Sequence, residues 1–210
     1  MRKVYKAKTE DLMLEIYNDE HAKTPREWDN LGTMVCEHKR YDLGDAQATG
    51  KEGSWQGEIE HQVEEPEKAV ILPLYLYDHS QLAMDTKSFV GRAHHAEWDS
   101  GEIGFIYATY EDIKEWFMTD EITEDTLELT RKMLKGEVKT YNNYLQGKVY
   151  GFELFKKEAC EHCGHTEKEL IDSCFGFYGN EFESNGLMEH AGDMISMEQA
   201  QKLFNNLDFA

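Results

Sequence analysis

The sequence has no apolar stretch that approaches the ~20 residues needed for a membrane-spanning helix. Its N-terminal segment, MRKVYKAKTEDLML, is basic but has neither the long apolar core nor the small-residue cleavage site of a signal peptide. Four cysteines are too few for a disulfide framework in a chain of 210 residues. We therefore expect a soluble, cytoplasmic protein with no membrane partner.

Positive charge is also scarce. The chain contains 42 acidic and 22 basic residues, and its formal net charge is −20. Such a charge repels nucleic acids and anionic membranes, and it attracts basic protein surfaces. Hydrophobic residues make up 40% of the chain, an ordinary globular composition, so the acidity does not indicate disorder. The composition disfavours direct nucleic-acid binding, and the charge is either simply solvated or directed at a basic partner.

Two apolar segments in the middle of the chain predict the core of a sheet. Residues 70–77 (VILPLYLY) and 103–108 (IGFIYA) are short, continuous and rich in β-branched and aromatic residues. This pattern is typical of strands that are buried on both faces. We interpret the two segments as core strands of one sheet.

A long helix is predicted to begin after Thr123, which is a suitable N-cap residue. Apolar residues then recur at helical spacing and are expected to pack on the sheet: Leu127, Leu134, Val138, Tyr141 and Leu145. A shorter helix is expected over 111–117, with Ile113, Trp116 and Phe117 pointing inward. With predicted hairpins near both ends of the chain, the pattern indicates one α+β domain over residues 1–210, a largely antiparallel sheet with helices packed on one face.

Familiar catalytic motifs are missing from the sequence. It has no phosphate-binding loop, dinucleotide fingerprint, nucleophile elbow or pair of metal-binding histidines at helical spacing. Acidic residues do lie at the ends of predicted strands at Asp78, Asp99 and Asp172, and with His38 and His79 they would form an acid/base or metal site if they converged. The commoner alternative is that such residues satisfy backbone groups in turns.

Cys160 and Cys163 have the spacing of half a zinc site, with two residues between the thiols. A closed site needs four ligands, and the further candidates are His162, His165, Cys36, His38 and Cys174. A second cysteine pair of this kind is absent from the sequence. We therefore expect no bound cofactor, with zinc as the alternative at this hairpin tip.

The acidic residues are concentrated in two segments. The first carries Glu58, Glu60, Glu64 and Glu65 within residues 52–67. The second contains eight acids and one lysine, and its acids are Glu111, Asp112, Glu115, Asp120, Glu121, Glu124, Asp125 and Glu128. Carboxylates on rigid helices can reproduce a phosphate pattern, so these residues are candidates for contact with a basic partner. The alternative is that they serve helix N-termini and solubility.

Several segments resemble a family of uncharacterised proteins encoded by bacteriophages and mobile elements. They are WDNLGTMVCEHKRYDLGD, ILPLYLYDHS, WDSGEIGFIY, GEVKTYNNYLQGKVYGFEL and DSCFGFYG, and they cover most of residues 28–179. The sequence departs from the family over 81–97 and at the cysteine-bearing hairpin tip. The resemblance carries no established activity. It implies a bacterial-host context, in which small acidic phage proteins inhibit host defence as anti-restriction or anti-CRISPR proteins.

The first functional hypothesis is therefore a non-enzymatic inhibitor. It would bind a basic nucleic-acid-handling host protein through its acidic segments, as a nucleic-acid mimic. The rival is a metal-dependent or acid/base hydrolase centred on His38, Asp78, His79, Asp99 and Asp172. A third hypothesis is a phage accessory protein with a neutral protein-binding interface.

Overall fold

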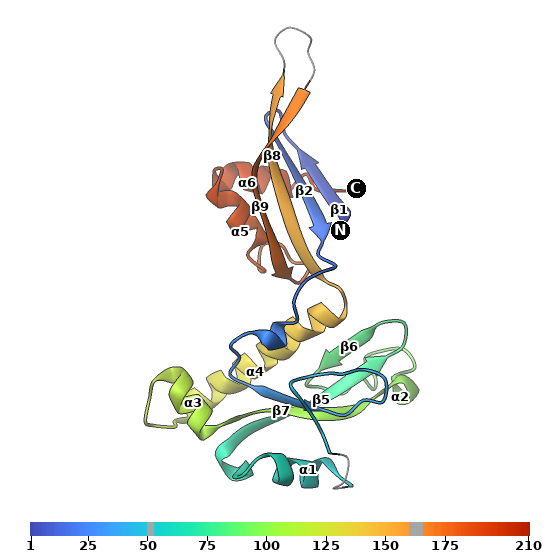
Figure 1. Ribbon diagram of the computed structural model, residues 1–210, viewed down its shortest axis with the longest axis vertical. Coiled ribbons are helices and arrows are strands. Elements are labelled where there is room, and N and C mark those ends of the chain that lie inside the picture. The colour runs from blue at the N-terminus through green and yellow to red at the C-terminus, as the bar shows by residue number, and fades with distance from the viewer. Residues whose placement is uncertain (50–52, 160–165) are drawn as a thin grey trace. The chain divides into compact units, whose positions relative to one another are not determined.

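Two five-stranded sheets and their helices make up the protein (Figure 1). The computed structural model describes residues 1–49, 53–159 and 166–210. Strand pairing is antiparallel except between β3 and β4, so the predicted α+β class with a largely antiparallel architecture is confirmed. The division of the strands between two sheets is not evident from the sequence.

Contacts group the chain into two compact units. One comprises Met1–Lys23 and Gly147–Ala210, and the other comprises Thr24–Gln146. The assignment of one domain to residues 1–210 stays a prediction, because compactness alone does not say whether a unit folds independently. No helix within the described residues is long and apolar enough to cross a membrane.

The first unit is a sheet with the strand order β10-β1-β2-β8-β9. Its elements are β1 (Arg2–Lys8), β2 (Leu12–Asn18), β8 (Val149–Ala159), β9 (Thr166–Tyr178), α5 (Leu187–Asp193), α6 (Met197–Phe204) and β10 (Asp208–Phe209). Alternate residues of β2 and β8 face the two short helices, so Leu14, Ile16 and Phe152 form a buried core with Leu187 and Leu203.

The second unit is inserted between neighbouring strands of the first. The chain leaves β2 at Asn18 and returns at Gly147, 129 residues later. The two ends are held together, because the Asn18 side-chain amide donates to the carbonyl oxygens of Gly147 (2.6 Å) and Val149 (3.2 Å). β2 and β8 then pair in antiparallel register along their length.

The second unit contains a sheet with the strand order β4-β3-β7-β5-β6. Its strands are β3 (Thr33–Cys36), β4 (Ala46–Gln47), β5 (Ala69–Asp78), β6 (Leu82–Asp85) and β7 (Ser100–Thr109). Its α-helices are α1 (Trp55–Gln62), α2 (Ala96–Asp99), α3 (Tyr110–Phe117) and α4 (Glu124–Leu145), and 3₁₀ helices occupy Pro25–Glu27 and Pro66–Lys68. The two predicted core strands, β5 and β7, pair with each other.

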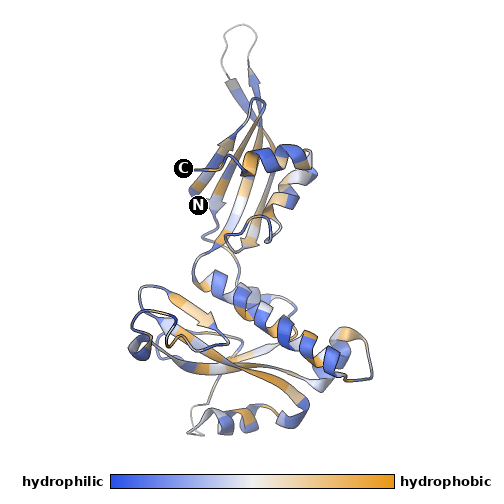
Figure 2. Cartoon of the chain, turned by 180° about the vertical axis from the view of Figure 1, so that it is seen from behind, coloured by the Kyte–Doolittle hydropathy of each residue, from blue (hydrophilic) through white to orange (hydrophobic). Residues whose placement is uncertain are grey.

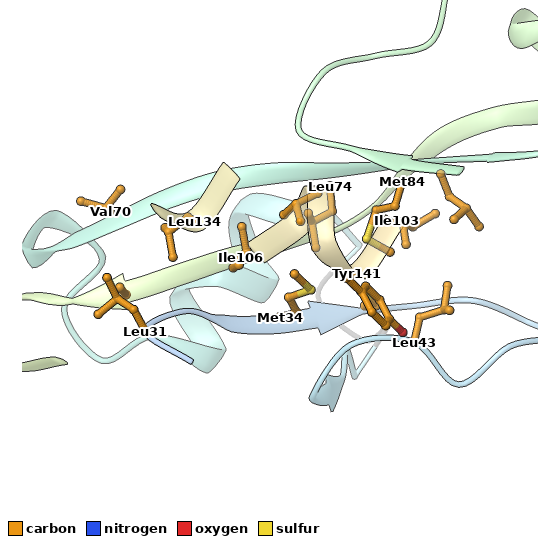
Figure 3. Packing of buried hydrophobic residues seen from close by; sticks show 14 of the residues in the cluster. Leu31, Met34, Leu43, Val70, Leu74, Met84, Ile103, Ile106, Leu134 and Tyr141 are labelled. Carbon is orange, nitrogen blue, oxygen red and sulfur yellow. The ribbon is translucent and has the colours of Figure 1, made fainter. Parts of the chain in front are cut away.

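Helix α4 packs its apolar side against one face of this sheet, as its spacing predicts. Leu134 and Tyr141 of α4 lie among Met34, Leu74 and Ile106 of three strands (Figure 3). The outward side of α4 is largely hydrophilic (Figure 2). On the opposite face of the sheet, α1 covers a smaller cluster that contains Val35, Val63 and Phe105.

A buried arginine fixes the segment that precedes β3. The Arg26 side chain is only 5% exposed, and it donates to both carboxylate oxygens of Asp45 (3.0 and 2.6 Å). It also donates to Glu137 Oε2 of α4 (2.9 Å) and to the carbonyl oxygen of Gly32 (2.5 Å). Since a buried charge is tolerated only when it is paired, this network ties three segments together.

Candidate functional site

Eight carboxylates form a surface on α3, α4 and the loop between these helices, here called the acidic surface. It consists of Glu111, Asp112, Glu115, Asp120, Glu121, Glu124, Asp125 and Glu128, and all eight residues are exposed. Thr109 and Thr123 cap the two helices, and acids in the first turn are stabilised by the helix dipole. This local rule explains the positions of four of the eight: Glu111, Asp112, Glu124 and Asp125.

Most carboxylates of the acidic surface have no ion-pair partner within the described part of the chain. Asp112 accepts hydrogen bonds from the backbone N–H (2.8 Å) and hydroxyl (2.7 Å) of Thr109, and Glu124 pairs with Arg131 at 3.0 Å. The other six form no ion pair with any basic side chain in the described residues. Their charge is therefore available to a partner.

Large apolar side chains are exposed in the same segment. Trp116 is 39% exposed, Met118 is 93% exposed, and Leu129 is exposed on α4. Met118 also adopts the left-handed conformation (φ 51°) that ends α3, which is costly for a residue other than glycine. The prediction that Trp116 points inward is wrong. Only Ile113 of α3 is fully buried, because few residues of this short helix face the sheet.

The first acidic segment does not form a uniform surface. Glu60, Glu64 and Glu65 are exposed, and Glu65 pairs with Lys68 at 2.6 Å. Glu58 is 2% exposed, so its expected place on a partner-binding surface is wrong. Its carboxylate accepts from the backbone N–H (2.7 Å) and hydroxyl (2.8 Å) of Thr49, which fixes the preceding loop.

The environment of Glu58 also sets its charge state. Burial raises the pKa of this carboxyl group, but the hydrogen bonds from Thr49 and Gln62 outweigh burial and hold the pKa below its usual value. Glu58 is therefore a charged structural residue, and the sequence gives no sign of this because its neighbours are equally acidic.

Four of the five strand-end residues lie together at one end of the second unit's sheet. Tyr77 of β5 pairs with Ser100 of β7, so the antiparallel register brings the end of β5 beside the start of β7. His79 Nδ1 lies 2.8 Å from Asp99 Oδ2, and His38 Nε2 lies 3.8 Å from Asp78 Oδ2.

Asp78, His79 and Asp99, but not His38, line an open pocket of about 470 Å³. Its lining consists of Arg40, Tyr41, Asp78, His79, Ser80, Gln81, Leu82 and Asp99. Arg40, which the sequence does not single out, forms an ion pair with Asp78. Asp172 is not part of this site: it lies in β9 of the first unit, opposite Leu154 of β8.

The pocket is suited to proton transfer. A carboxylate that holds one ring nitrogen of His79 leaves the other nitrogen available to a substrate or a water molecule. Among the described residues, no three His, Cys, Asp or Glu side chains are arranged to hold a metal ion.

Comparisons with protein-family models, curated proteins and solved structures each find no match. The assignments below therefore depend on the geometry and chemistry of this chain.

The predicted zinc ligands Cys160 and Cys163, together with His162 and His165, lie outside the described residues. Of the more distant candidates, Cys36 is fully buried in β3, and burial raises the pKa of its thiol to about 12. A thiol that stays protonated is a poor zinc ligand, so Cys36 is better explained as a core residue.

Proposed function

We propose that the protein is an acidic phage-type inhibitor that binds a basic nucleic-acid-handling protein of a bacterial host through the acidic surface. The observation that supports this proposal is the occurrence of unpaired carboxylates and exposed Trp116, Met118 and Leu129 in one segment. Single exposed apolar residues are common on protein surfaces, so the support comes from their occurrence together with the unpaired carboxylates.

The two kinds of side chain have complementary roles in binding. Apolar and aromatic residues that become buried supply most of the affinity of a protein interface. Carboxylates steer a basic partner and disfavour neutral or acidic ones. Six exposed carboxylates that form no ion pair in the described residues share one stretch of chain with Trp116 and Met118, which supports binding to a groove that normally holds a phosphate backbone. The protein would then act as a nucleic-acid mimic.

The experiment is a pull-down from bacterial host lysate at low and high salt, followed by binding kinetics with the captured partner. The test variant combines Glu121→Gln, Glu124→Gln, Asp125→Asn and Glu128→Gln. A matched control removes four exposed carboxylates of the first unit, by Glu181→Gln, Glu183→Gln, Glu189→Gln and Asp193→Asn. The melting temperature of both variants should change little, because exposed charges contribute little to folding.

Association of the test variant should slow by roughly tenfold or more, while the control stays within about threefold of the wild type. The affinity should also fall steeply with salt, because the Debye length shrinks from ~10 Å at 0.1 M to ~3 Å at 1 M. Equal binding by test variant and wild type, without salt dependence, would contradict the proposal and favour a neutral interface.

A second candidate function is acid/base hydrolysis, which the His79–Asp99 pair on an open pocket favours. His79 would accept a proton from an attacking water, with Asp99 orienting the ring. Hydrolysis of nitrophenyl acetate and bis(nitrophenyl) phosphate tests it, with His79→Gln as the variant and exposed His61→Gln as the control. If the protein is such a hydrolase, the hydrolysis rate should fall about a hundredfold in His79→Gln and stay unchanged in His61→Gln. If the wild-type protein hydrolyses neither substrate, this candidate function is rejected.

A further inference from the structure

A groove of about 670 Å³ lies between α1 and the β5–β7 pair. Its apolar lining is formed by Ile59, Pro66, Ile71, Pro73 and Phe105, and its polar lining by Gln56, Glu60, Glu67 and Glu102. The groove exists because α1 has only eight residues, whereas β5 and β7 have ten each. The short helix therefore leaves part of this sheet face uncovered.

A β-bulge brings Glu102 to the same face as Phe105. Residues three apart in a regular strand point to opposite faces of the sheet. In β7, however, Gly104 pairs with Leu74 and Glu102 pairs with Tyr75, so Ile103 is an extra residue without a partner. Ile103 packs in the core beneath α4, and Glu102 returns to the groove. Bulges often re-aim a side chain in this way at functional positions.

The groove has charge of one sign only. Three carboxylates line it, and no lysine or arginine does so among the described residues. The nearby Lys68 is paired with Glu65. Partial burial raises the pKa of Glu102, and no cation in the described part of the chain offsets the effect. By contrast, hydrogen bonds from Lys3 and Tyr17 lower the pKa of Glu15 despite its burial. A bound cation would stabilise the charged form of Glu102.

We propose that this groove binds an extended peptide segment of a partner protein whose groove-facing residues, every second one along the segment, include both basic and apolar side chains. The side chains of lysine and arginine combine an apolar stem with a charged head. Their stems would lie on Ile71, Pro73 and Phe105, and their heads would reach Glu60, Glu67 and Glu102. The groove shares no residue with the acidic surface, so this inference stands independently of the function proposed above.

The edge of β5 supports an extended ligand. β7 pairs with β5 along one edge, but on the other edge β6 pairs only with Tyr75–Asp78. Within the described chain, Ala69–Leu74 therefore has no strand on that edge. A free strand edge can accept an added strand from a ligand. Proline occurs on edge strands because it has no N–H to donate, and Pro73 would limit unspecific pairing at this edge.

Two short probes with equal charge test the apolar and the charged parts separately. They are the capped peptides Arg-Ser-Leu-Ser-Arg and Arg-Ser-Ser-Ser-Arg, in which the first, third and fifth side chains face the same side of an extended chain. Each is titrated against full-length protein by calorimetry at 0.15 M salt. The leucine peptide should bind at least about fivefold more tightly, because only the groove offers it an apolar floor. Equal affinity for both peptides would mean attraction by net charge alone, and no binding of either would equally overturn the proposal.

The affinity for the leucine peptide should fall roughly tenfold in a variant that combines Glu60→Gln, Glu67→Gln and Glu102→Gln. A control variant loses the same number of charges through Glu181→Gln, Glu183→Gln and Glu189→Gln, and its affinity for the peptide should stay within about twofold of the wild type. If both variants lose affinity equally, the peptide binds outside the groove. The acidic-surface variant should keep its affinity for this peptide. A failure of the groove and a failure of the acidic surface are thus distinguishable.

Discussion

Replacement of Arg26 by methionine should lower the free energy of unfolding by about 3–5 kcal/mol, the usual cost of removing one partner from a buried ion pair. The side chain would lose four hydrogen bonds: two to Asp45, one to Glu137 and one to Gly32. Methionine keeps much of the apolar volume, so the cost is electrostatic rather than a packing defect.

The two carboxylates left behind keep some of their partners. Asp45 still accepts from the backbone N–H of Met34 at 2.7 Å, and Glu137 still accepts from Leu31 (3.0 Å) and Gly32 (3.1 Å). We therefore expect the lower half of the range, near 3 kcal/mol, with the remaining penalty caused by two facing negative charges.

Urea unfolding at pH 7 measures the effect. The control is Arg131→Met, which breaks the exposed pair with Glu124 and should cost less than about 1 kcal/mol. Adding Glu137→Gln to Arg26→Met should recover part of the loss, since it removes one unpaired charge. If Arg26→Met and Arg131→Met cost the same, the buried network does not contribute to stability as argued.

Three further predictions concern single side chains. Leu74→Ala should cost about 2–5 kcal/mol in denaturant melts, because Leu74 is fully buried, and a loss under about 1 kcal/mol would contradict its core position. The pKa of Glu58 is lowered, so the charged carboxylate stabilises the fold above the ordinary pKa of 4.5, and this contribution is lost as the pH falls through the folded-state pKa. In Glu58→Gln, the free energy of unfolding should therefore decrease less steeply at acidic pH than in the wild type. Elemental analysis of fresh protein should find no zinc, and one zinc per chain that Cys163→Ser abolishes would establish the metal site instead.

Local patterns in the sequence were sufficient for the main elements. The spacing from Leu127 to Leu145 and the cap at Thr123 predict α4, and the apolar segments predict β5 and β7. The strand-end residues of β5 and β7 could be expected to meet, because antiparallel neighbours place the end of one strand beside the start of the next.

Features that depend on tertiary contacts were not predictable. Glu58 is buried although its neighbours in α1 are equally acidic, and Trp116 is exposed although α3 is amphipathic. Pro73 in β5 and Gly101 and Gly104 in β7 are compatible with a bulge in this strand pair, but they do not indicate that Ile103 is the extra residue or which face Glu102 occupies. β2 pairs with the adjacent β1 but also with β8, which lies more than a hundred residues away, and short-range patterns cannot indicate this second pairing.

The long excursion between Asn18 and Gly147 has a consequence for the order of events during synthesis. At ~5–20 residues per second, a ribosome needs on the order of 10 s to advance the 129 positions from Asn18, the end of β2, to Gly147, just before its second partner strand β8. During that interval Leu12, Leu14 and Ile16 have emerged without the strand and helices that bury them. Thr24–Gln146, by contrast, is complete in one continuous stretch and is free to form its contacts first. The N-terminal hairpin is therefore the segment of the nascent chain most in need of protection from aggregation.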